Sequence, residues 1–202
     1  GMTDAAPERV RSIDDNQDAL LWRLRLIEAA QEQIILATFD FWDEEGGRDV
    51  MGALWNAAER GVEVQVLVDG INGGGRPLSG SDLFCQLAAH ENVEVRLYNP
   101  LNLLTPWKTN YRMHDKYLIA DDLAYLLGGR NTDNRFLGRY TDQYNEDRDI
   151  LVYETEPGQG QSYRQLRDYF NRIWSLPCCK VLDQPGEGAD LSRCYEETKA
   201  KY

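Results

Sequence analysis

Residues 33–69 read QIILATFDFWDEEGGRDVMGALWNAAERGVEVQVLVD, and this stretch decides the fold class. Both of its ends are apolar, β-branched runs that are typical of buried strands. Between them, residues 49–60 carry a helical pattern, with Asp49 as the expected N-cap and Gly61 directly after the helix. A strand, a helix and a second strand in this order predict two parallel strands joined by a crossover helix.

The same alternation continues on both sides of this stretch. Residues 16–32 have helical periodicity, and Ser81 is a suitable N-cap for a further helix that precedes a strand at 93–97. Further along, the sequence predicts a hairpin within 112–127, a strand at 149–154 and an amphipathic helix at 162–174. We therefore expect an α/β fold, a mixed, largely parallel sheet flanked by helices on both faces.

Composition narrows the class of partner. The 202 residues include 22 basic and 34 acidic side chains, which gives a net charge of −12. This balance argues against nucleic acid, because phosphate binding needs clustered Lys and Arg. The four cysteines form no C-x-x-C pair and there are only two histidines, which argues against a metal site and is typical of a cytoplasmic protein with reduced thiols. No apolar run reaches the roughly 18–20 residues that span a bilayer.

The chain divides into a main lobe and two flanking segments. We expect residues 12–176 to form the lobe, because the periodic elements fall within it. Residues 1–11 are a polar N-terminal segment, in which Gly1 before Met2 is interpreted as the remnant of a removed tag. Residues 177–202 contain Pro177 and Pro185 and are expected to be an extension or a linker toward a second lobe.

The chemistry is concentrated in residues 113–131. His114 and Lys116 are two positions apart on a predicted strand, so their side chains share a face, and Asp121 follows at the end of that strand. Gly128 and Gly129 then allow the backbone to approach a ligand closely, and Asn131 can present an amide beside the same face. Such a combination at strand ends, where open sheets bind ligands, favours a ligand site over an ordinary exposed His–Lys pair.

These residues resemble the phospholipase D superfamily signature, H-x-K-x4-D followed by G-G/S-x-N. Several further segments are similar to the first half of bacterial cardiolipin synthase-like proteins, and the likeness covers roughly residues 12–176. The segments are 39–44, 57–64, 98–100, 110–116, 128–131 and 170–175.

The resemblance implies phosphodiester exchange on a phospholipid without a cofactor or metal. His114 is expected to be the nucleophile that forms a phosphohistidine, while Lys116 and Asn131 stabilise the phosphate oxygens. Asp121 is expected to anchor Lys116 or the loop, and Asp149 to accept a hydrogen bond from the histidine ring or to serve only as a strand-initiating residue. The substrate-binding candidates are two glycines and three aromatic residues of a lipid cleft or of the core: Gly128, Gly129, Trp42, Trp107 and Tyr111.

Only one copy of the motif is present. His90 lacks a Lys two positions later, so it is interpreted as structural and the chain as holding half of an active site. The other half would come from a homodimer mate or from a second lobe of a longer protein. We expect a phosphatidyltransferase at the inner face of the membrane, in peripheral contact with it. The alternatives are a homodimeric phosphodiesterase or nuclease, and a non-catalytic lobe that binds lipid or a partner.

Overall fold

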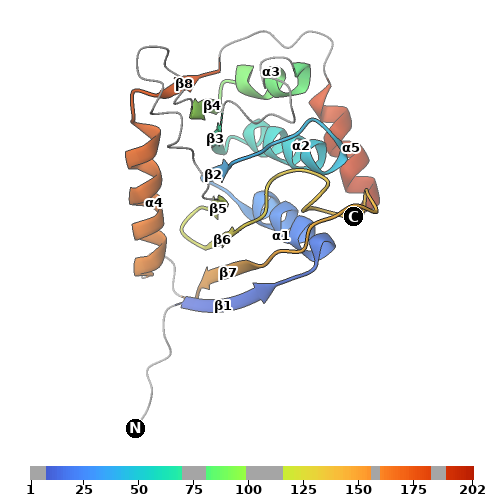
Figure 1. Ribbon diagram of the computed structural model, residues 1–202. Coiled ribbons are helices and arrows are strands. Elements are labelled where there is room, and N and C mark those ends of the chain that lie inside the picture. Colours follow the sequence, from blue (N-terminus) through green and yellow to red (C-terminus); the bar gives the residue numbers. More distant parts are fainter. Residues whose placement is uncertain (1–7, 70–80, 99–115, 156–159, 183–189) are drawn as a thin grey trace, which may run out of the picture.

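The structure, a computed structural model, describes residues 8–69, 81–98, 116–155, 160–182 and 190–202. They form one sheet with helices on both of its faces (Figure 1). In chain order the elements are β1 (Glu8–Ile13), α1 (Asn16–Ala29), β2 (Gln33–Thr38), α2 (Glu45–Glu59), β3 (Glu63–Asp69), α3 (Asp82–Ala89), β4 (Val93–Tyr98), β5 (Lys116–Ala120), β6 (Ala124–Gly128), β7 (Asp149–Glu154), α4 (Gln161–Trp174), β8 (Cys179–Val181) and α5 (Leu191–Lys201).

The expectation of a mixed sheet with helices on both faces is confirmed. The strand order is β1-β7-β6-β5-β2-β3-β4-β8. Parallel pairing is confined to β2–β3 and β3–β4, where crossover helices join the strands, and the other neighbouring pairs are antiparallel. Less of the sheet is parallel than "largely parallel" implied, because the hairpin and the strands at both edges return in the opposite direction.

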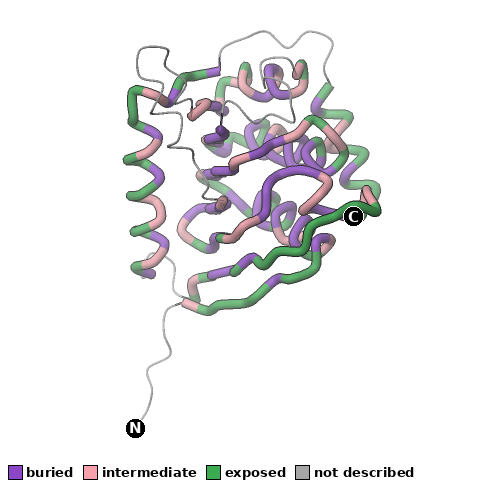
Figure 2. The backbone as a smooth tube through the Cα atoms, in the orientation of Figure 1, coloured by how far each residue is buried: buried purple, intermediate pink, exposed green. Residues whose placement is uncertain are grey.

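Two apolar cores lie on opposite faces of the sheet. The larger core joins alternate strand residues, such as Leu36 and Leu118, to α1, α2, α3 and Leu191 of α5. The smaller core joins the intervening residues, such as Ala37 and Tyr117, to α4. Figure 2 shows the resulting buried interior between the sheet and the helices. Because side chains of a strand alternate between faces, each catalytic candidate can be assigned to one core or the other.

The helix after β2 starts earlier than its sequence pattern indicated. Helix α2 begins at Glu45, so Asp49 is not its N-cap but lies inside the helix, 2% exposed. The two glycines at 46 and 47 are buried where the first turn of α2 meets Trp42 and the 132–137 segment. The cap of α3 is as expected, since Ser81 Oγ accepts a hydrogen bond from the Phe84 N–H at 3.3 Å.

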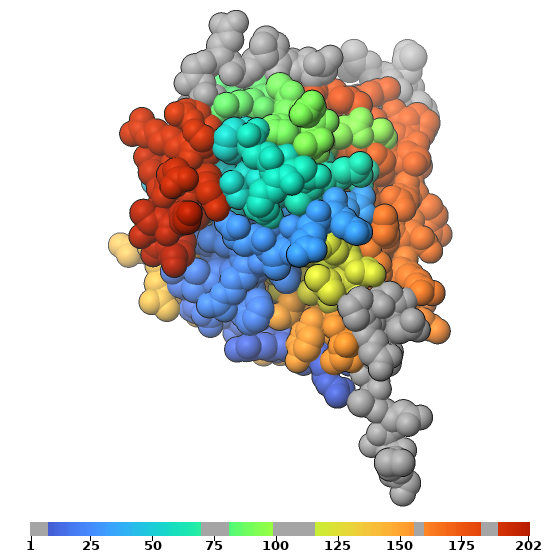
Figure 3. Space-filling view, turned by 180° about the vertical axis from the view of Figure 1, so that it is seen from behind, coloured from blue at the N-terminus to red at the C-terminus, as the bar shows by residue number. Residues whose placement is uncertain are grey.

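Both flanking segments contribute to the folded unit. Strand β1 pairs with β7 at one edge of the sheet, and β8 pairs with β4 at the other. Helix α5 packs on α2, as the view from behind shows (Figure 3), and a Cβ atom at Gly52 would lie 2.7 Å from the Tyr195 nitrogen. The described part of residues 177–202 is therefore ordered structure that packs against the lobe.

Candidate active site

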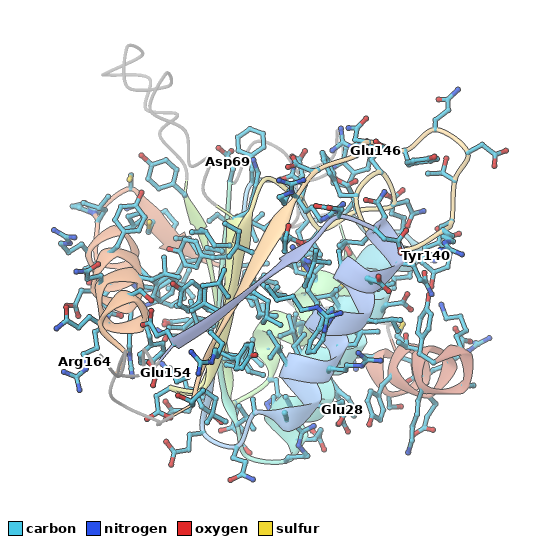
Figure 4. The ribbon with its side chains drawn as sticks, turned by 90° about the horizontal axis from the view of Figure 1, so that it is seen from below. Glu28, Asp69, Tyr140, Glu146, Glu154 and Arg164 are labelled. Carbon is cyan, nitrogen blue, oxygen red and sulfur yellow. The ribbon has the colours of Figure 1, made fainter. Side chains whose placement is uncertain are left out.

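Three candidate positions meet on one rung of the sheet. Lys116 begins β5 and pairs with Gly128 at the end of β6, which in turn pairs with Asp149 at the start of β7. By alternation from Leu118, Leu126 and Leu151, all three lie on the face covered by α1 and α2. With about 4.8 Å between strands, Lys116 and Asp149 are about 10 Å apart along the rung. Figure 4 shows Asp69, the last residue of β3, at this end of the strands, and Glu154, the last residue of β7, at the opposite end.

The absence of a side chain at Gly128 gives Asp149 its place. A Cβ atom at position 128 would lie 2.4 Å from Asp149 Oδ1 and 2.5 Å from the Arg148 carbonyl oxygen. At Gly129 an added Cβ would lie 2.2 Å from Asp147 Oδ2. The glycine pair thus accommodates neighbouring protein groups, and the carboxylate of Asp149 lies over Gly128 toward the Lys116 side.

Asn131 is fixed by the backbone that follows β2. Its Oδ1 accepts a hydrogen bond from the Asp40 N–H at 3.0 Å, and the residue is 8% exposed. The Nδ2 group therefore remains as the donor end of the amide. Lys116 reaches the same place, because its Nζ lies 5.7 Å from the centre of the Phe39 ring. Lys116 and Asn131, on different strands and loops, converge where β2 ends.

An acidic and aromatic cluster borders this point. Arg135 binds Asp40 at 2.9 Å and Asp133 at 2.7 Å, and its guanidinium lies 4.2 Å from the centre of the Trp42 ring. Burial raises the pKa of the Asp40 carboxyl, and the ion pair with Arg135 partly opposes that shift. Trp42 is half-buried, and its backbone N–H donates to the carbonyl oxygen of Thr132, the residue after Asn131, at 3.0 Å.

Asp149 is fully buried between two arginines. Its Oδ2 lies 2.7 Å from Arg23 Nη1 and 3.1 Å from Arg130 Nε. Its Oδ1 has no hydrogen-bond partner among the residues that the structure describes. A carboxylate arranged in this way has one oxygen bound and one oxygen available as an acceptor.

Asp121 lies at the other end of β5. Its carboxylate accepts hydrogen bonds from the backbone N–H groups of Gln31, Glu32 and Gln33, at 2.8–2.9 Å. It follows Lys116 by five positions along the strand, which corresponds to about 16 Å. Of the two anchoring roles expected for Asp121, the geometry therefore matches the loop before β2 and not Lys116.

Three expected site residues, His114, Trp107 and Tyr111, lie outside the described residues. The shared face of His114 and Lys116 stays a prediction. His90 lies far along the chain from the motif, and both of its ring nitrogens are engaged, with Glu59 Oε1 at 2.8 Å and with the Asn92 N–H at 3.0 Å. In the described parts of the chain, no group of three or more His, Cys, Asp or Glu residues is arranged to hold a metal ion.

Comparison with known proteins identifies the family. The family model described as "Cardiolipin synthase, PLD-like domain" matches residues 24–174. The chain belongs to this family. Cardiolipin synthase C of Escherichia coli is 32% identical over 192 residues, which cover 88% of this chain and 38% of that protein. The chain thus spans well under half the length of this relative.

Solved structures agree on the fold of this PLD-like domain. Nuc from Salmonella typhimurium, a phospholipase D family member, superposes with a TM-score of 0.66 at 16% identity, over 88% of this chain and 99% of Nuc. The phosphatidylserine synthase of Haemophilus influenzae gives a TM-score of 0.69 at 16% identity, over 95% of this chain and 42% of that enzyme. One neighbour is thus matched over its whole length and the other over less than half.

Reasoning from the sequence missed the charged partners of the PLD-like domain. Arg130 lies inside the G-G-R-N segment, but no sequence pattern indicated a role for it. Asp40 and Arg135 belong to no motif that would have indicated a function. Arg23 could have been noticed, because it follows Leu20 by three residues and precedes Ile27 by four, and so lies on the inward face of α1. A charged residue on an apolar helix face needs a buried partner, and here that partner is Asp149.

Proposed function

We propose that this domain carries half of the active site of a phosphatidyltransferase that exchanges phosphodiester bonds on phospholipids, as a cardiolipin synthase does. The observation that carries the proposal is that Lys116, Asn131 and Asp149 come together at one end of the central strands, two residues along the chain from His114. A cation, an amide donor and a carboxylate are the groups that a phosphoryl-transferring histidine needs around it.

In the proposed reaction, the His114 imidazole attacks the phosphorus and the bond to the first alcohol breaks. Lys116 Nζ and the Asn131 amide stabilise the negative charge that builds on the phosphate oxygens. Asp149 Oδ1 accepts the N–H of the histidine ring and so keeps the opposite nitrogen free to attack. The leaving alcohol takes a proton from a general acid of a second motif, and a second alcohol then attacks the phosphohistidine and returns that proton.

The second motif comes from a second lobe or from a homodimer mate. Since the substrate is a lipid, the domain is proposed to work at the inner face of the membrane in peripheral contact with it, with Trp42, Trp107 and Tyr111 lining the lipid cleft. Within the residues described, none of the helices combines the length and the hydropathy needed to cross a bilayer.

The experiment is transfer from labelled phosphatidylglycerol by the assembled enzyme. His114→Ala is expected to abolish turnover with the fold intact, because the nucleophile has no substitute. Lys116→Ala is expected to lower kcat by on the order of 10²-fold or more, as loss of a charge-stabilising donor does. Lys180→Ala, an exposed lysine on β8, is the control and is expected to keep the parent rate. Near-parent activity of either site variant would contradict the mechanism.

A homodimeric phosphodiesterase or nuclease is the second candidate. The match covers 99% of the solved Nuc chain, so that chain consists of a single lobe of this fold. The net charge of −12 counts against a nucleic acid substrate. Hydrolysis of bis(p-nitrophenyl) phosphate or of DNA by the 202-residue chain, without transfer to an alcohol, would favour this second candidate.

A further inference from the structure

The buried cluster around Asp149 contains more positive than negative charge. The side chains of Arg130 and Asp149 are 0% exposed and that of Arg23 is 7% exposed. Two guanidinium groups share the single carboxylate, which leaves a formal charge of +1. Burying an uncompensated charge is costly, so an arrangement of this kind needs a specific reason.

Both arginines also donate hydrogen bonds to backbone or amide oxygens. Arg130 donates to the Phe136 carbonyl oxygen at 3.1 Å, to the carbonyl oxygens of Asp14 and Asp147, and to Asn16 Oδ1. Arg23 Nη1 donates to the Ala19 carbonyl oxygen at 3.1 Å. Each guanidinium thus has a partner besides Asp149, and each has a nitrogen within 3.1 Å of the same oxygen, Asp149 Oδ2.

We infer that Arg23 and Arg130 are positioning residues of this site, which hold Asp149 by Oδ2 and so keep Oδ1 over Gly128 on the Lys116 side. The inference rests on the proposed function, because it makes Oδ1 the acceptor for the His114 ring. A carboxylate held in a fixed direction keeps an imidazole in one tautomer, and the wrong tautomer cannot act as nucleophile. Arg130 also directly precedes Asn131. These two neighbouring residues therefore contact Asp149 of β7 and the backbone after β2, respectively.

The nearby acids do not replace Asp149 in this arrangement. Asp14, Asp15 and Asp147 also interact electrostatically with Arg130, and all three are exposed. Asp147 Oδ1 accepts the N–H of Arg148 at 2.7 Å. Among these four carboxylates, Asp149 is the one that both arginines bind as an ion pair.

The test reads the His114 ring directly by NMR and needs no turnover. The 202-residue chain has only two histidines, so ¹⁵N-labelled histidine gives two ring systems, and His90→Gln assigns them. The tautomer of His114 is measured in the parent and in Asp149→Asn, Arg23→Met and Arg23→Lys. The matched control is Arg25→Met, which removes the same charge from the same helix but at an exposed position beside Trp22.

We expect a single neutral tautomer in the parent and in Arg25→Met, and a mixture in Asp149→Asn and Arg23→Met. Arg23→Lys keeps the charge but loses the planar fork, so its mixture is expected to be smaller. If Arg23→Met does not fold, as judged by circular dichroism, the tautomer mixture of Arg23→Lys alone is compared with that of the parent. A single tautomer in both Arg23 variants, with a mixture in Asp149→Asn, would overturn the inference and leave the proposed function standing.

A single tautomer in Asp149→Asn would overturn the role of Asp149 in the proposed function and with it the inference. In the assembled enzyme, Arg23→Lys is expected to lower kcat by about tenfold or more with KM unchanged, since it alters the chemistry and not the lipid contacts. A rise in KM at constant kcat would contradict a positioning role.

Discussion

At the residue scale, Gly128 gives the site its geometry, because its lack of a side chain lets the Asp149 carboxylate of β7 lie over β6, the strand next to Lys116. In Gly128→Ala, the new Cβ would meet Asp149 Oδ1 at 2.4 Å and the Arg148 carbonyl oxygen at 2.5 Å. We expect a loss of about 1–3 kcal/mol in the free energy of unfolding, as for other overpacked sites. We also expect a loss of activity in the assembled enzyme that exceeds what the unfolded fraction explains. Chemical denaturation and kinetics of the same variant measure both.

The control for this prediction is Leu127→Ala. Leu127 is the preceding residue on β6, points to the opposite face and is 39% exposed. Its truncation is expected to cost about 1 kcal/mol of stability and to leave kcat at the parent value. Equal kcat values for Gly128→Ala and the parent would show that Asp149 does not need its present place.

A second prediction at this scale concerns Asp121, which belongs to the motif but lies far from Lys116. Its φ of 50° is a left-handed conformation that Asn also tolerates, so Asp121→Asn isolates the loss of the charged acceptor. We expect a cost of about 1–3 kcal/mol in stability, since three backbone N–H groups lose part of their acceptor. The activity per folded molecule is expected to stay at the parent level. A fall in kcat without a fall in stability would indicate that Asp121 takes part in catalysis.

At the scale of elements, α5 is held to the lobe by a buried carboxylate of α2. Asp49 accepts hydrogen bonds from Thr198 Oγ1, from the Tyr140 hydroxyl and, at 2.9 Å, from Lys201 Nζ. Figure 4 shows Tyr140 on its loop next to α5. Burial, helped by the hydrogen bond to Asp49, raises the pKa of the Tyr140 hydroxyl, so this hydroxyl stays a donor.

Removal of the cation in this cluster is expected to weaken the α2–α5 contact. Lys201→Met leaves the Asp49 carboxylate buried without its ion-pair partner, and we expect a cost of about 1–2 kcal/mol, reduced by the partial exposure of Lys201. Lys199→Met, an exposed position on the same helix, is the control and is expected to stay within about 0.5 kcal/mol of the parent. Thermal unfolding of the two variants provides the comparison, and equal midpoints would mean that packing alone holds α5.

At the scale of the whole molecule, one histidine motif supplies only one of the two imidazoles that the proposed reaction needs. A single imidazole cannot attack the phosphorus and protonate the leaving alcohol in the same step, and loss of a general acid costs about 10²–10⁴-fold. We expect little or no phosphatidyl transfer by the 202-residue chain, measured with labelled phosphatidylglycerol over a range of protein concentrations. Addition of a segment that carries a second motif is expected to restore transfer.

Light scattering on the same samples decides between the two sources of the second motif. Activity that rises with the dimer fraction of the 202-residue chain would show a site shared by two copies. The His114→Ala variant of that chain then serves as the control, since it can dimerise but cannot supply either imidazole. Activity from a monomer would contradict the half-site altogether.

The sequence by itself was sufficient for the fold class and for the strand–helix–strand unit at 33–69, and it named Lys116 and Asn131 as candidates, while Asp149 became a candidate through the family resemblance. Strand alternation and the glycine pair are local signals, so they can be read without contacts between distant residues. It was not sufficient for the start of α2, for β1, β8 and α5, or for the roles of Arg23, Arg130 and Asp49. Only the tertiary structure decided these, because a short edge strand needs its partner to form. A buried charge is likewise explained only by the group that it meets across more than a hundred residues, as Arg23 meets Asp149.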